Sequence, residues 1–264
     1  MLEFLFDMPL VVTGPAIIGS LCLFAVVGLL VVRRRVLPRL HIQAGDSHFT
    51  GTMVHSVMVF YGLAVALMAV NVSETYTDVS RIVSGEASSL NALYRDVSSY
   101  PEPIRLELQK ELRDYVDQVI HQAWPLQQRG QTPTAGIEHM SRFQAVLDKF
   151  EPASEGQKIL HGETLHAFNE MIQARRLRLD AVATGLPAVM WAVIVAGAFI
   201  SLIASFFFKV EDARLHGILV TLLAVFIGLL IFMTFALDRP FRGDLGLPPD
   251  PYQLVYDHLM KGES

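Results

Sequence analysis

The chain contains four long apolar stretches, and none of them includes Asp, Glu, Lys or Arg. They cover residues 9–32, 53–72, 186–208 and 217–237. A helix of roughly 20 apolar residues is long enough to cross the hydrocarbon core of a bilayer. The pattern therefore predicts four transmembrane helices, arranged as an N-terminal pair within residues 1–72 and a C-terminal pair within residues 185–237.

The segment between the two pairs, residues 73–184, is polar and has the periodicity of amphipathic helices. One helix is predicted to begin near Pro103 and to close at Trp124 and Pro125, with an apolar face made of Ile104, Leu108, Leu112, Tyr115, Val119 and Ala123. Further helices are expected over residues 137–150 and 155–184. The sequence thus predicts an all-α integral membrane protein, with a helical extramembrane domain inserted between spans two and three and a tail over residues 238–264.

Composition supports the membrane class and excludes others. Hydrophobic residues make up 52% of the chain and the mean hydropathy is +0.40, which is high for a soluble protein of 264 residues. The net charge of -5 is spread over the polar middle and forms no basic patch, so nucleic acid is not expected as a partner. Cys22 is the only cysteine and lies in the first span, so one chain can form neither a disulfide nor a cysteine metal site.

Basic residues in the short loops predict the orientation in the membrane. The loop between the first two spans contains Arg33, Arg34, Arg35 and Arg39, and the loop between the last two contains Lys209 and Arg214. By the positive-inside rule these loops are cytoplasmic, which places both termini and the helical domain outside. Arginines at positions 239 and 242 favour the opposite orientation, as do those at 175, 176 and 178 within the longer domain.

One side of the second span carries mostly small or hydroxyl-bearing residues, and this stripe continues beyond the membrane to Asn91. Its first part comprises His55, Val59, Gly62, Ala66, Ala69, Ser73 and Thr77. Two interpretations are open, because small residues permit close helix packing in lipid and weakly dipolar surfaces also line water-filled pores. We take these positions as candidate pore-lining residues, and Asn71, Glu74 and Arg81 as candidates for the pore mouth.

Catalytic chemistry has little support in the sequence. Glu163, His166 and Glu170 share a helix face and supply half of a di-iron carboxylate pattern, but the second Glu-x-x-His is absent. Asp117 and His121 could add ligands from another helix, although a solvated ion-pair face explains the same spacing. No phosphate-binding glycine loop or hydrolase motif is present. We therefore predict no enzyme activity, no cofactor and no metal.

The fourth span ends abruptly in LDRPFRGDLG, residues 237–246. We predict that these residues form a structural clasp between the membrane helices and the helical domain, with Asp238 and Arg239 docking near Glu74, Arg175 and Arg176. Pro240 would end the helix, Phe241 would insert into the bundle, and Arg242 completes the set of clasp candidates.

Several segments resemble one family. The order of spans and domain, together with EASSLNALYRDV (86–97), AWPLQQRG (123–130), GLPAVMWAV (185–193) and LDRPFRGDLG, is similar to the bestrophin-like family of bacterial and plant membrane proteins. By analogy with bestrophins, the resemblance implies a homopentameric anion channel in a bacterial inner membrane, with a pore lined mainly by the second span. It also implies a cytoplasmic large domain, against the arginines of the short loops, to which we give more weight.

Two features depart from true bestrophins. The aromatic neck that their second span carries is reduced to Phe60 and Tyr61, which adjoin in sequence and so point in different directions. The acidic residues after the fourth span, Asp238, Asp244, Asp250 and Asp257, are spread along the tail and form no calcium-binding cluster. Calcium gating is therefore not expected.

We predict an oligomeric membrane ion channel that conducts anions such as chloride passively, with the second span lining the pore. Its expected partners are the lipid bilayer, further copies of the same chain and inorganic ions. The alternative is a non-conducting, membrane-anchored scaffold or sensor whose helical domain binds a partner. An open polar stripe on the second span favours the channel, and tight packing over that stripe favours the scaffold.

Overall fold

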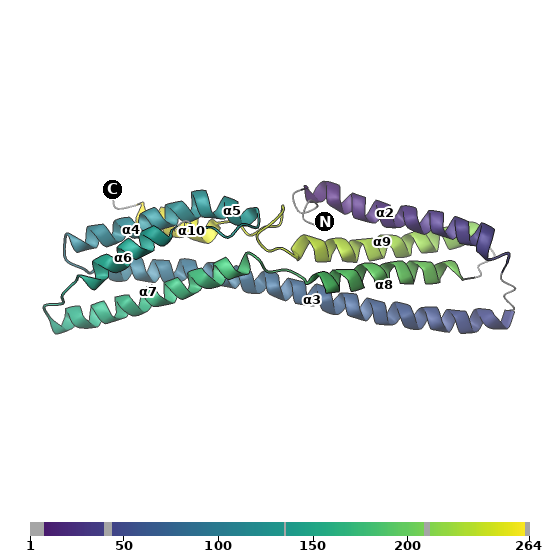
Figure 1. The fold of residues 1–264 in the computed structure, drawn as a ribbon, viewed down its shortest axis with the longest axis horizontal. Helices are drawn as coiled ribbons and strands as arrows, with labels where there is room; N and C mark the ends of the chain where they lie inside the picture. Colours follow the sequence, from purple (N-terminus) through teal and green to yellow (C-terminus); the bar gives the residue numbers. More distant parts are fainter. Residues whose placement is uncertain (1–7, 40–43, 135, 209–211, 262–264) are drawn as a thin grey trace. The chain divides into compact units, whose positions relative to one another are not determined.

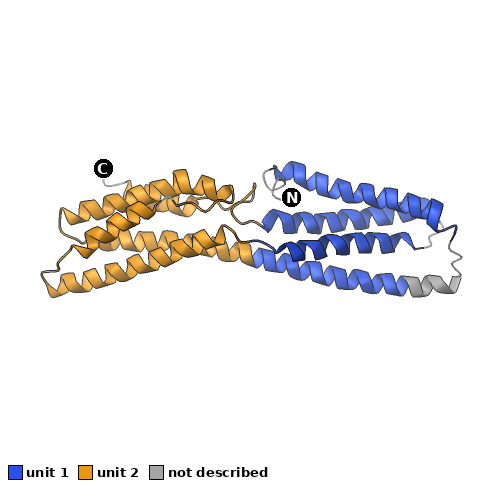
Figure 2. Cartoon of the chain, viewed as in Figure 1, with its two compact units in different colours: residues 1–74, 185–238 blue, residues 75–184, 239–264 orange. Residues whose placement is uncertain are grey.

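The computed structural model describes residues 8–39, 44–134, 136–208 and 212–261, and only the backbone of residues 44–50. The described residues form helices and no strand, as the sequence predicts. Chain contacts divide the molecule into two units, coloured blue and orange in Figure 2. The first unit comprises residues 1–74 and 185–238, and the second comprises residues 75–184 and 239–264. Helix α3 (Ala44–Val97) contributes its beginning to the first unit and its remainder to the second.

The first unit consists of α2 (Leu10–Val31), the beginning of α3, α8 (Ala188–Phe206) and α9 (Ala213–Leu237), shown in Figure 1. A five-residue π-helix, η1 (Val32–Val36), follows α2 and contains Arg33, Arg34 and Arg35 of the first loop. Four helical segments among the described residues are long and apolar enough to cross a membrane: Leu10–Val36, Gly51–Val97, Ala188–Phe206 and Ala213–Leu237. Apolar side chains cover their outer faces as well as their contacts, which is typical of helices surrounded by lipid.

Glycines allow α2 and α9 to pack closely. A Cβ atom on Gly228 would lie 3.1 Å from the Cα atom of Ile18, and one on Gly14 would lie 3.1 Å from the ring of Phe232. Small residues at such positions let helix backbones approach in an apolar environment, where dispersion contacts replace the hydrophobic effect as the source of helix association. These contacts set how closely α2 and α9 pack in the first unit.

The second unit gathers the remainder of α3 with α4 (Ile104–Gln118), α5 (Trp124–Gln128), α6 (Ile137–Asp148), α7 (Glu155–Ala181) and α10 (Asp250–Val255). The five-residue π-helices η2 (Val119–Ala123) and η3 (Tyr256–Met260) extend α4 and α10. Its core includes Leu90 and Leu93 of α3, Leu108 and Leu112 of α4, and Phe143 of α6. The predicted apolar face of α4 is confirmed, since all its members except Ile104 are buried.

Two helix ends differ from the sequence prediction. The helix expected to close at Trp124 and Pro125 instead continues to Gln128. Pro125 is tolerated because it occupies the first turn of α5, where its missing N–H is not required, directly after the wider π-helical turn of η2. Helix α7 begins at Glu155 as predicted, with the Ser154 hydroxyl accepting a 3.2 Å hydrogen bond from the Gln157 N–H, but it ends at Ala181 rather than Thr184.

Candidate conduction face and the contacts around it

Packing within the first unit sets the rotation of α3 about its axis. Val54, Val65 and Val72 recur at helical spacing and are buried against the other helices of this unit. Tyr61 lies on the same side, and its hydroxyl donates a 3.1 Å hydrogen bond to the carbonyl oxygen of Ile194 in α8. The opposite side of α3 is therefore turned away from α8.

The predicted stripe lies mostly on this outward side. His55, Val59, Gly62, Ala66, Ser73 and Thr77 are all exposed within the single chain. Ala69 is the exception at 9% exposure, because the three-residue step from Ala66 rotates it back toward the buried side that carries Val65 and Val72. Ala69 is thus an inward-packing residue in the isolated subunit, and its place in the pore lining stays a prediction.

The three pore-mouth candidates are exposed but do not form one group. Asn71 and Glu74 lie on the surface of α3 in the first unit, and Asn71 is two residues from Ser73, which places it across the helix from the stripe. Arg81 belongs to the second unit, where its Nη1 atom contacts Asp78 Oδ1 at 2.8 Å. The place of these three candidates at a pore mouth stays a prediction.

The aromatic residues of α3 diverge, as the sequence predicts. Phe60 is 72% exposed, whereas Tyr61 is half-buried and bonded to α8. Leu63 and Leu67 are also exposed on the side of Phe60. The outward surface of α3 therefore has two parts, a strip of small residues and a neighbouring strip of large apolar side chains.

Gly197 is needed for the contact between Tyr61 and α8. A Cβ atom added there would lie 2.5 Å from Cε2 of Tyr61, closer than real contacts permit. We expect Gly197→Ala to lower the thermal stability of the detergent-purified protein, since overpacking typically costs about 1–3 kcal/mol. Gly217→Ala is the matched control, because nothing lies within 4 Å of the corresponding position. Equal melting temperatures for the two variants would contradict this packing.

A buried ion pair in the second unit connects α3 to α7. The Nε atom of Arg178 donates to Glu86 Oε2 at 2.7 Å and its Nη2 atom donates to Oε1 at 3.2 Å, while the Tyr115 hydroxyl donates to Oε1 at 2.7 Å. Neither charged side chain is more than 1% exposed. Burial, followed by the negative charge of Glu86, raises the pKa of Tyr115, so this hydroxyl remains protonated and acts as a donor.

Aromatic rings surround the cation of this pair. The guanidinium carbon of Arg178 lies 5.6 Å from the ring centre of Tyr252 and 6.0 Å from that of Trp124. Tyr252 comes from α10, so the tail closes the site over the ion pair. Sequence reasoning missed this network because Glu86 and Arg178 are 92 residues apart. One signal was available: Glu86 falls on the side of α3 that carries Val79, Val83 and Leu90, where a charge needs a partner.

The sequence comparison decides the family. A family model described as the bestrophin-like domain matches residues 20–252. The chain belongs to the bestrophin-like family. The resemblance inferred from the Glu86 segment and the LDRPFRG terminus is therefore confirmed.

Solved structures show the same fold. Two crystal structures of point mutants of a bacterial bestrophin homologue from Klebsiella pneumoniae match this bestrophin-like chain with TM-scores of 0.67 and 0.68, each at 11% identity. The matches cover 94% of this chain and 98% and 99% of the other. A crystal structure of a mutant membrane protein gives a TM-score of 0.67 at 11% identity, covering 94% of this chain and 98% of the other. No curated protein sequence matches significantly.

Arg239 and Arg242 of the LDRPFRG terminus contact segments of the second unit that are distant in the sequence of this bestrophin-like chain. Arg239 Nη1 donates to the carbonyl oxygens of Ala183 and Thr184 at 3.1 and 3.4 Å, just after α7 ends. A Cβ atom on Gly130 would lie 3.3 Å from the Cδ atom of Arg242. These contacts lie within the second unit, where carbonyl groups after a helix end attract a guanidinium. Docking of Arg239 near Glu74 stays a prediction.

Phe241 inserts into the core of the second unit, as predicted. It is 2% exposed, and its ring packs edge-on against Trp124 with centres 5.6 Å apart. The indole N–H of Trp124 donates to the Leu247 carbonyl at 2.9 Å, and the Leu247 N–H donates to the Pro240 carbonyl at 2.8 Å. The turn after Pro240 is thus tied to α5 by both packing and hydrogen bonds.

Asp238 is bonded within the first unit rather than to the arginines predicted for it. Its carboxylate accepts a 2.6 Å hydrogen bond from the Leu186 N–H and a 3.1 Å hydrogen bond from the indole N–H of Trp191. Asp238 is 3% exposed. The carboxylate therefore joins the end of α9 to the beginning of α8 and satisfies two donors that are buried with it. A clasp that joins the two units stays a prediction.

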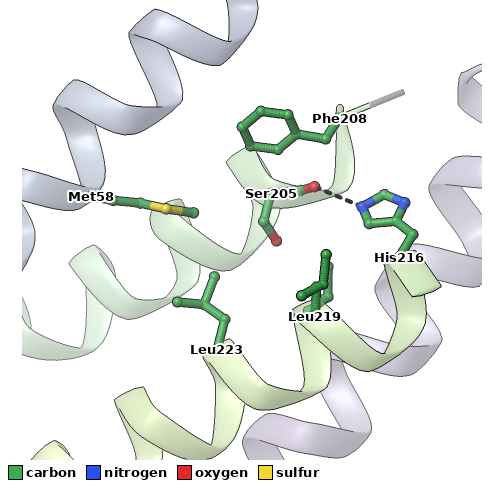
Figure 3. Close-up of a pocket in the computed structure, with 7 residues that line it drawn as sticks. Met58, Ser205, Phe208, His216, Leu219 and Leu223 are labelled. Atoms are coloured by element: carbon green, nitrogen blue, oxygen red, sulfur yellow. Dashed lines mark hydrogen bonds between the residues drawn. The ribbon is translucent and has the colours of Figure 1, made fainter. Parts of the chain in front are cut away.

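A cavity of about 270 Å³ lies near the link between α8 and α9 (Figure 3). It is lined by Met58, Ser205, Phe208, His216, Leu219, Val220 and Leu223. His216 Nε2 donates to the Ser205 carbonyl at 3.1 Å, and the Ser205 hydroxyl donates to the Leu202 carbonyl at 2.6 Å. The other five lining residues are apolar, so we do not include the cavity in the conduction path.

The residues considered as catalytic carboxylates form exposed surface pairs. His166 and Glu170 lie 3.3 Å apart with side chains 70% and 61% exposed, and His121 lies 3.1 Å from Asp117. Such contacts are ordinary solvated pairs within one helix. They do not bring together the ligands of a buried metal centre.

Proposed function

We propose that this bestrophin-like protein is an oligomeric membrane ion channel, with passive conduction of anions along the outward face of α3. Family membership and the shared fold support a channel, and the four apolar helices support its insertion in a membrane. The observation that carries the pore assignment is the exposure of six of the seven predicted lining residues in the isolated subunit. Surfaces this poor in large side chains leave room for a shared axial path between subunits.

The side chains of the stripe favour weak binding of ions over tight binding. Its members offer hydroxyl groups, an imidazole and helix backbone, and no lysine or arginine lies within the span. Dipoles can replace part of the hydration shell of an ion without holding it, which is a requirement for conduction. We infer chloride-like anions from the analogy with bestrophins, and a ring of subunits, five by the same analogy, with the helical domain outside the cytoplasm.

Conductance in planar bilayers tests this proposal. Under a chloride gradient, we expect wild-type currents to reverse near the chloride equilibrium potential. Gly62→Leu should lose most of the current, because its side chain would project into open space on the stripe, where nothing lies within 4 Å of a Cβ atom. Gly19→Leu makes the same change at an exposed position on α2 with equally open surroundings, and it should conduct normally.

If the oligomeric protein carried no current at any voltage or pH, the proposal that it is a channel would be rejected. That result would favour the scaffold or sensor, in which the stripe of α3 is covered by neighbouring subunits. A reversal potential that follows the cation gradient would retain the channel and reject anion conduction. Equal currents from Gly62→Leu and Gly19→Leu would reject α3 as the lining helix.

A further inference from the structure

Three potential metal ligands meet between α4 and α6 in the second unit. Glu111 and Asp114 lie one turn apart on α4, and His139 lies in the first turn of α6. Among the described residues, their carboxylate oxygens and imidazole nitrogen lie within 4.8 Å of one another. The shortest separation, 2.8 Å, joins His139 Nδ1 to Glu111 Oε2. His139 lies 25 residues after Asp114 and 28 after Glu111, which is why the pattern of the sequence did not indicate the cluster.

Negative charge dominates the cluster. The guanidinium of Arg142 contacts Glu111 Oε2 through Nε at 3.2 Å and Glu138 Oε1 through Nη1 at 3.0 Å. With His139 neutral, the three carboxylates of Glu111, Asp114 and Glu138 and the one guanidinium leave two negative charges, so a second cation is electrostatically favoured.

The carboxylate of Glu111 is held in place at this cluster. His139 Nδ1 lies 2.8 Å from Glu111 Oε2, and Arg142 Nε donates to the same oxygen at 3.2 Å. The Glu111 side chain is 11% exposed, and that of His139 is 18% exposed. The three candidate ligands are therefore held by two different helices, and two of them are partly shielded from water.

We propose that Glu111, Asp114 and His139 bind a divalent transition-metal ion of the zinc class. One imidazole and two carboxylates suit zinc, whereas calcium and magnesium prefer sites built from oxygen alone. Zinc bonds of about 2.0–2.2 Å place tetrahedral ligands roughly 3.4 Å apart, so side-chain rotation has to shorten a separation of 4.8 Å by about 1.4 Å. Water would complete the coordination.

Arg142 competes with the metal for the same position. Its Nη2 atom lies 2.9 Å from His139 Nδ1 and its Nε atom contacts Glu111, so it touches two of the three ligands. The side chain is 46% exposed and has a second partner, Glu138, on its own helix. The guanidinium can therefore turn toward Glu138 when zinc arrives.

Zinc affinity of the untagged, full-length protein in detergent tests the proposal, measured by competition with a chromophoric chelator. We expect one bound zinc ion per chain, a loss of affinity of roughly tenfold or more in His139→Ala, and a gain of roughly tenfold in Arg142→Gln, each equivalent to about 1.4 kcal/mol. His166→Ala is the matched control, because it removes an exposed histidine from another His–Glu pair. Zinc should also raise the wild-type melting temperature, since it binds only the folded state.

Asp114→Asn provides a second test that does not depend on the fold tolerating the loss of His139. It should weaken zinc binding while leaving the contacts among Glu111, His139 and Arg142 in place. Unchanged zinc affinity in both His139→Ala and Asp114→Asn would overturn the site. The proposal would also fail if the wild-type chain bound no zinc and only the Arg142→Gln variant did. The result is independent of conduction, because no residue of this cluster belongs to the proposed pore face.

Discussion

Arg178→Met should lower the free energy of unfolding of the second unit by about 3–5 kcal/mol. The substitution keeps an apolar stem beside Trp124 and Tyr252 but leaves the carboxylate of Glu86 buried without a cation. The chain has two tryptophans, and Trp124 lies in the second unit. Denaturant unfolding followed by the fluorescence of Trp124, in a Trp191→Phe background, therefore reports on this unit.

A double variant separates the cost of an unpaired charge from the cost of lost packing. Glu86→Leu combined with Arg178→Met removes both charges, so it should be much less destabilising than the sum of the single changes. Arg176→Met is the matched control, because Arg176 is 84% exposed and its contact with Asp180 is 3.9 Å long. It should change the unfolding free energy by less than about 0.5 kcal/mol. Equal effects of Arg176→Met and Arg178→Met would show that the pair is not buried in the folded protein.

Asp238→Ala should destabilise the first unit by about 2–4 kcal/mol. The carboxylate satisfies the N–H of Leu186 and the indole N–H of Trp191, and both donors would lose their partner inside an apolar environment. Asp238→Asn should cost less, since one amide oxygen still accepts while the amide nitrogen faces a donor. Unfolding can be followed by the fluorescence of Trp191 in a Trp124→Phe background.

Asp212 offers a graded comparison for Asp238. It is exposed, belongs to the first unit, and accepts a 2.8 Å hydrogen bond from the Arg214 N–H at the beginning of α9. Its replacement by Ala should cost about 1 kcal/mol, as is usual for the loss of a helix N-cap. If Asp212→Ala and Asp238→Ala were equally destabilising, the buried position of Asp238 would have no special role.

The sequence could predict the helices because their signals are local. Uninterrupted apolar runs indicate the four candidate spans, and the spacing of Leu108, Leu112 and Tyr115 indicates which face of α4 is buried. The rotation of α3 could not be read with the same precision. Ala69 has the size and chemistry of the stripe, but its burial depends on where α8 lies, and that position is fixed by the distant contact between Tyr61 and Ile194.

The buried charges show the larger limit of sequence reasoning. Arg178 was counted with Arg175 and Arg176 as a basic cluster, yet only its spacing of seven residues from the buried Met171 marks it as inward-facing. Its partner lies on α3 and its aromatic neighbours lie on α5 and α10, so four segments must be placed before the pair can be recognised. The role of Asp238 was equally hidden in the sequence. An aspartate at the end of an apolar run has the pattern of a charge at the membrane interface, and its two hydrogen-bond donors lie about 50 residues earlier in the chain.

The core of the second unit is assembled from distant parts of the chain, and this imposes an order on biosynthesis. Phe241, Leu247 and Tyr252 complete a core whose first members precede residue 100. Domains usually fold as they leave the ribosome, N-terminal parts first. Here the α3 surface that carries Glu86 has to wait for α7 and then for α10 before its charge is neutralised and covered. A chain that ended before α10 would therefore leave this surface without the cover of Tyr252.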